Sequence, residues 1–227
     1  MNKIKKFKAT FENGGFWEFY KDLEKQFEGF LEYVPYVNGN EGTYSFKLLS
    51  LILSIGGYID SAFKEMARFS EFSEDELCKK ILKRAKEKLG IIKSGVEAFD
   101  KNYGISTKVV TFKFIPKRDY IKPFEFTEHK PEWWGFYTEL KHDVGVNLEK
   151  ANLRNTRDAL AAAFLLNTLH TPSVLRLLDY GLMKNKISHR EVTPSPRNRE
   201  VIENMLRKRE KINSFIETPV FVYDYEQ

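Results

Sequence analysis

Apolar residues recur along much of the chain at the three- and four-residue spacing of amphipathic helices. Residues 16–34 show this spacing, and a turn at Asn38-Gly39-Asn40 follows them. Residues 43–69 form the longest helical candidate. Their apolar positions nearly encircle the helix from Phe46 to Ile55, which predicts a central, buried helix.

Two adjacent glycines, Gly56 and Gly57, interrupt this central helix. Each costs about 1 kcal/mol relative to alanine inside a helix. The pair therefore predicts either a close crossing by another helix or a kink. Asp60 and Lys64 follow, and their four-residue spacing puts them on one helical face.

The later part of the chain is also mainly helical in pattern. Three alanines inside the stretch "ALAAAFLL" predict a tight helix–helix contact around Ala159–Ala163. The remaining predicted helices are 73–89 with Ser73 as N-cap and Gly90 as C-cap, 96–103 ended by Gly104, 132–142, 148–169, 171–182 and 198–215.

Two segments are extended in pattern. Residues 107–115, "TKVVTFKFI", are rich in β-branched and aromatic residues, and residues 220–225 resemble them, so the two could pair as a small ribbon. Strands alternating with helices are not seen. The predicted fold is an all-α helical bundle with a minor β element at 107–115 and 220–225. Residues 1–183 are expected to form the helical domain, with residues 184–227 packing on it as a loop, a basic helix and an extended segment.

Composition adds little to this picture. Aromatic residues make up 15% of the chain, enough for a sizeable core, and the net charge of +5 permits a nucleic-acid partner without requiring one. The single cysteine, Cys78, excludes an intrachain disulfide. No signal peptide is visible, and the most apolar run, 48–55, is too short to cross a bilayer, so a cytoplasmic protein without membrane contact is expected.

The common chemical motifs are missing. The four histidines lack a second His or Cys at helical spacing, and the chain has no HExxH, CxxC, GxxxxGK[ST], GxGxxG or GxSxG motif. No metal or cofactor is therefore expected.

The segment "PEWWGFYTELKHD", residues 131–143, combines aromatic and ionisable residues. In one interpretation, an apolar stripe of Trp133, Phe136/Tyr137 and Leu140 packs inward, while Lys141 and His142 merely complement the helix dipole at its C-terminus. In the other, His142 lies at the mouth of a cleft and faces Asp60 or Lys64 as a proton-exchanging group.

Three motifs resemble proteins of the HEPN-like superfamily (higher eukaryotes and prokaryotes nucleotide-binding) over residues 16–170. They are a long helix beginning at Tyr44-Ser45 and carrying Asp60 and Lys64, a segment with Trp134, Tyr137, Lys141 and His142, and a helix with Ala151, Asn152, Asn155, Ala159 and Leu160.

The resemblance implies a helical bundle, often dimeric, and in many members a metal-independent ribonuclease. In those enzymes an Arg precedes a His with four to six residues between them, the 2′-hydroxyl attacks the adjacent phosphate, and the Arg stabilises the developing charge. This chain lacks the motif, because Tyr137, Phe136 and Gly135 occupy the required positions before His142.

This resemblance and the missing arginine indicate two functions. The favoured one is a HEPN-like homodimer that binds RNA or a protein partner in a prokaryotic or phage defence setting. The alternative is a metal-independent endoribonuclease, and a helical bundle unrelated to the family remains a third interpretation. The candidate catalytic residues are His142 as acid-base group, Lys141 as phosphate cation and Asp60 as orienting carboxylate. The candidate ligand-binding residues are Lys64, Tyr137, Asn152, Asn155 and Arg154. Asn152 and Asn155 could instead cap the start of their helix.

Overall fold

The computed structural model describes residues 15–69, 76–87, 91–115, 119–125, 130–208 and 210–225. Its helices are α2 (Gly15–Leu31), α3 (Phe46–Phe69), α4 (Glu76–Lys86), α5 (Ile92–Tyr103), α6 (Glu132–His142), α7 (Val144–Asn147), α8 (Leu153–Leu169), α9 (Thr171–Asp179) and α10 (Pro196–Lys208), with 3₁₀ turns at Ile105–Thr107 and Leu148–Lys150. Its strands are β1 (Val110–Phe112), β2 (Asp119–Ile121), β3 (Met183–Asn185), β4 (Ser214–Glu217) and β5 (Phe221–Asp224).

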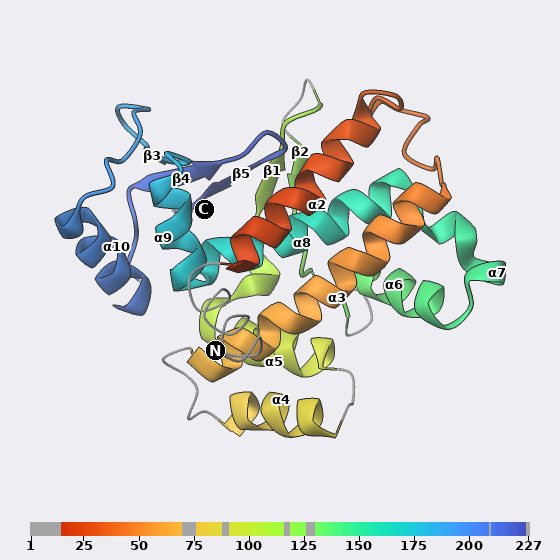
Figure 1. Cartoon of the computed structure of the whole chain (residues 1–227), viewed down its shortest axis with the longest axis horizontal. Coiled ribbons are helices and arrows are strands. Elements are labelled where there is room, and N and C mark those ends of the chain that lie inside the picture. Colours follow the sequence, from red (N-terminus) through yellow and green to blue (C-terminus); the bar gives the residue numbers. More distant parts are fainter. Residues whose placement is uncertain are drawn as a thin grey trace, which may run out of the picture.

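The central helix is α3, as its apolar pattern predicts. It packs against α2, α4, α5, α6 and α8, and Figure 1 shows it running across the middle of the molecule. Its largest contact is with α8, whose alanine stretch Ala159–Ala163 is fully buried. The predicted tight helix–helix contact is therefore confirmed within one chain, and these alanines are not available for an interface between two copies.

The all-α prediction is wrong, because the chain is α+β. It is mostly helical but contains a five-stranded antiparallel sheet in the order β2-β1-β5-β4-β3. The two predicted extended segments do pair, with Thr111 opposite Val222. The other three strands were not predicted. β2 and β3 have only three residues each, and β4 begins at Ser214, inside the predicted helix 198–215, although α10 ends at Lys208. A three- or four-residue strand is too short for a hydrophobic alternation to be distinguished from a helical or loop pattern.

The sheet joins distant parts of the sequence. β1 and β2 come from the middle of the chain and β3, β4 and β5 from its end, and the predicted domain boundary between residues 183 and 184 falls inside β3. On one face, Phe164 of α8 stacks on Phe221 of β5 at a ring-centroid distance of 5.6 Å. The sheet thus shares its core with the helices, and Figure 1 shows α2 and α8 beside it.

Most predicted helices are found with small shifts at their ends. The segment 132–142 matches α6 at both ends, and Gly104 ends α5 in the left-handed conformation at φ +61°. The predicted helix 148–169 is divided, since residues 148–150 form a 3₁₀ turn and α8 begins only at Leu153. The predicted caps Ser73 and Gly90 lie outside the described residues.

Candidate functional site

Helix α6 crosses α3 directly over Gly56. A β-carbon added at Gly56 would lie 2.2 Å from Cε2 of Tyr137, a distance that no real packing allows. At Gly57 the same atom would meet nothing within 4 Å. Of the two predictions made for the glycine pair, the close helix crossing is the one found, and Gly56 makes it possible.

A cleft of about 510 Å³ opens beside this crossing. It is lined by residues of four helices: Gly57, Asp60 and Lys64 of α3, Ala85 of α4, Ile92 of α5, and Trp134, Tyr137, Thr138, Lys141 and His142 of α6. Five predicted site residues therefore meet in one place, namely Asp60, Lys64, Tyr137, Lys141 and His142. Helical spacing explains the grouping, because Asp60 and Lys64 lie one turn apart on α3, as do Tyr137 and Lys141 on α6.

The carboxylate in the cleft is neutralised by its neighbour on α3. Asp60 and Lys64 form a half-buried ion pair, with side-chain exposures of 26% and 31%. Tyr137 lies against this pair. Burial, and secondarily the Asp60 charge, raises the pKa of the Tyr137 phenol, so the ring remains neutral and packs as an aromatic wall.

The cations on α6 are less constrained. Lys141 is exposed, and its Nζ lies 5.9 Å from the centroid of the Tyr137 ring. His142 is exposed at the last position of α6. Among the described residues, neither side chain has a carboxylate partner within ion-pair distance. Both also lie in the last helical turn, where positive charge is favourable, so their position at the cleft agrees with the dipole interpretation too, whereas the proton-exchanging role of His142 stays a prediction.

The two tryptophans of α6 have different environments. Trp133 is buried and donates a hydrogen bond from Nε1 to the carbonyl of Pro123 at 2.6 Å. Trp134 is half-buried and lines the cleft. Trp133 thus anchors α6 in the core, whereas the Trp134 ring forms part of the cleft wall.

Three predicted ligand-binding residues do not line the cleft. Asn152 is the N-cap of α8, and its Oδ1 accepts from the backbone N–H of Asn155 at 2.9 Å. Asn155 donates its own amide to the carbonyl of Lys150 at 2.9 Å. Both asparagines are thus engaged at the start of the helix, as the capping alternative proposes. Arg154 is exposed beside a separate polar hollow of about 260 Å³.

The buried Arg157 lines the same hollow and not the cleft of His142, and its ion pairs were not predicted from the sequence. The Arg157 guanidinium donates to Asp119 at 2.6 Å and to Asp158 at 2.7 Å, and it lies 4.9 Å from the Tyr36 ring centroid. Burial disfavours its charge, but the neighbouring carboxylates outweigh this and raise the pKa of Arg157. The only signal in the sequence is the adjacent charged pair Arg157-Asp158 beside the apolar stretch that begins at Ala159.

Within the part of the chain that the structure describes, no group of three or more His, Cys, Asp or Glu side chains is arranged to hold a metal ion. In the same part, Phe46–Arg68 is long and apolar enough to cross a membrane, and 56% of it is buried inside the protein. A core helix meets the same criterion, so the cytoplasmic location stays a prediction.

No family model matches the chain, and no curated protein or solved structure is significantly similar to it. The resemblance to HEPN-like proteins therefore stays a prediction carried by the motifs alone.

Proposed function

We propose that the cleft between α3 and α6 binds single-stranded RNA. The observation that carries this proposal is the position of Lys141 and His142 beside the half-buried ring of Trp134, where neither has a carboxylate partner among the residues that the structure describes. Single-stranded nucleic acids are bound by this combination, in which cations follow the phosphates and aromatic rings stack on bases.

The charge of the cleft favours an anionic ligand. Asp60 and Lys64 cancel each other, which leaves the ammonium of Lys141 to attract a phosphate. The aromatic wall favours a ligand that also carries a base able to stack on Trp134. An isolated phosphate would use Lys141 alone, whereas a nucleotide chain would also use Trp134, and bases in a duplex are not free to stack on a side chain.

The test is the affinity of a fluorescently labelled single-stranded RNA, measured by anisotropy at several salt concentrations. Lys141→Ala should weaken binding roughly fivefold and reduce the salt slope by about 0.7, since one phosphate contact is lost. Trp134→Ala should weaken binding by roughly fivefold or more through the loss of one stacked base.

The controls are matched in residue type. Lys25→Ala removes an exposed lysine of α2, and Tyr33→Ala removes a ring that is 85% exposed outside the cleft. Both should bind like the original protein. Equal losses in the cleft variants and the controls would contradict the proposal, as would an RNA affinity that does not depend on salt.

A second candidate is metal-independent RNA cleavage, favoured by the presence of His142 in the same cleft as the Asp60–Lys64 pair. His142 would remove the 2′-hydroxyl proton, the oxygen would attack the adjacent phosphorus, and the P–O5′ bond would break as the leaving 5′-oxygen takes a proton from water. RNA incubated with the protein in EDTA should then give 2′,3′-cyclic phosphate ends, and His142→Ala should abolish them while weakening binding no more than Lys141→Ala does. An intact RNA at high protein concentration would contradict this second candidate and leave the binding proposal in place.

A further inference from the structure

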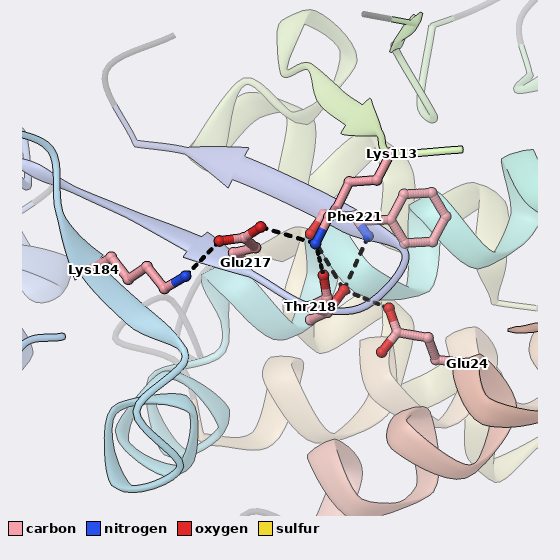
Figure 2. Close-up of polar contacts among 6 residues, drawn as sticks. All are labelled: Glu24, Lys113, Lys184, Glu217, Thr218 and Phe221. Carbon is pink, nitrogen blue, oxygen red and sulfur yellow. Dashed lines mark hydrogen bonds and ion pairs between the residues drawn. The ribbon is translucent and has the colours of Figure 1, made fainter. Parts of the chain in front are cut away.

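A buried carboxyl group joins α2 to the turn between β4 and β5. Glu24 is only 2% exposed, and so is Thr218 of the turn. The Thr218 hydroxyl donates to Oε1 of Glu24, the Tyr20 hydroxyl donates to the same oxygen at 3.1 Å, and the backbone N–H of Val220 also bonds the carboxyl. Figure 2 shows Glu24 reaching the turn from its helix.

The same turn is held from its outer side by ion pairs. Lys113 donates to the carbonyl of Thr218 at 2.9 Å and pairs with Glu217 at 2.8 Å, while Lys184 pairs with Glu217 at 2.6 Å (Figure 2). These lysines lower the pKa of Glu217, so its carboxylate stays charged at neutral pH. The turn is therefore held by two carboxyl groups. The charge of Glu24 can change near neutral pH, whereas Glu217 stays ionised.

We propose that Glu24 and the β4–β5 turn form a proton-dependent latch. The turn stays closed on α2 while the buried carboxyl is protonated, and ionisation of Glu24 favours the open turn, in which water can solvate the charge.

The surroundings of Glu24 account for this behaviour. Burial raises the pKa of Glu24 to about 7, although its hydrogen bonds to Thr218, Tyr20 and Val220 act in the opposite direction. In the described part of the chain, the charged groups around the network are Glu28, Lys113 and Glu217. Glu28 on α2 raises the pKa further, and Lys113 lies beyond the turn and is paired with Glu217. From α8, the neighbouring side chain is the apolar ring of Phe164, which packs on Tyr20.

When the turn opens, water reaches the Glu24 carboxyl and ionisation becomes favourable. The opening equilibrium must then increase with pH, because the closed form binds the proton more tightly than the open form. With the pKa of Glu24 near 7 in the closed form and 4.5 for the free side chain, opening should increase about tenfold between about pH 6 and about pH 8.

The experiment is hydrogen exchange of the full chain, followed at the amides of residues 214–224 and corrected for the intrinsic effect of pH. In the original protein, the protection factors of these amides should fall about tenfold between these two pH values. Glu24→Gln should abolish this dependence, whatever its absolute protection. Glu217→Gln should weaken the same turn from its outer side yet keep the dependence, since Glu217 remains ionised over the whole range.

A pH dependence that survives in Glu24→Gln, or that is missing from the original protein, would overturn the proposal. If Glu24→Gln does not fold, the same hydrogen-exchange measurement on Thr218→Val tests the proposal. Loss of the Thr218 hydroxyl removes a bond that lowers the pKa of Glu24, so the midpoint of the transition should move to higher pH. An unchanged or lower midpoint overturns the latch.

Discussion

The ring of Tyr137 rests directly on the backbone of Gly56, and this contact sets the distance between α3 and α6. It is also where the candidate cleft begins, since Gly57 and Tyr137 both line it. The packing of the two helices and the shape of the cleft therefore depend on the same missing side chain.

Gly56→Ala should destabilise the protein, because its new methyl group would overlap the Tyr137 ring. Overpacking of this kind costs about 1 to 3 kcal/mol, against a gain of about 1 kcal/mol in helix propensity. The free energy of unfolding, measured with denaturant, should fall accordingly. Gly57→Ala is the control, since its methyl group meets nothing within 4 Å, and it should be neutral or stabilising by up to about 1 kcal/mol. Equal effects at the two positions would contradict the close crossing.

Asn152→Ala should remove the N-cap of α8 and lower the free energy of unfolding by about 1 kcal/mol. RNA affinity should not change, because Asn152 does not line the cleft. Asn204→Ala, at an exposed position of α10, is the control and should leave both quantities unaltered. A loss of RNA affinity without a loss of stability would instead support the ligand-binding role predicted for Asn152.

Arg157→Ala should be destabilising by about 1 to 3 kcal/mol, because it would leave the half-buried carboxylates of Asp119 and Asp158 without their shared partner. Arg157→Lys should recover only part of this loss, since an ammonium can neither fork between two carboxylates nor stack on Tyr36. Arg154→Ala, three residues earlier and exposed, should change the free energy of unfolding little. Near-equal effects of Arg157→Ala and Arg154→Ala in urea denaturation would exclude a structural role for the buried ion pairs.

His170 and Glu24 should give opposite slopes of stability against pH. Burial lowers the pKa of His170 from 6.5 to about 4, so its contribution of roughly 3 kcal/mol is present above pH 6.5 and is lost as the pH falls toward 4. The raised pKa of Glu24 acts in the other direction. Its contribution, also roughly 3 kcal/mol, is present below pH 4.5 and is lost as the pH rises toward 7.

Between about pH 4.5 and 6.5 the two effects should largely cancel. His170→Asn should therefore produce a stability that falls with rising pH, and Glu24→Gln one that rises with it, both measured by urea denaturation across this range. A double variant should restore a flat profile. Parallel slopes in the two single variants would show that the buried groups do not titrate in this way.

The helices are the part of the fold that sequence reasoning predicted best, because their signals are local. Apolar spacing located α2, α3 and α6, and the placement of Asp60 and Lys64 on one face of α3 needs only the helical repeat. The meeting of those residues with Lys141 and His142 was a hypothesis from motif order. Its geometry is observed, whereas its chemistry stays a proposal.

By itself, the sequence determined which segments are helical and which faces of those helices are polar, since both follow from interactions within one or two turns. Beyond the pairing of β1 with β5, tertiary structure alone decided the sheet, because β2, β3 and β4 gave no extended pattern of their own and are completed by partner strands in the fold. It also decided the burial of Glu24, whose partner Thr218 lies 194 residues away. Contacts of this range leave no pattern in the local sequence, because the residue that stabilises a buried polar group need not be anywhere near it in the chain.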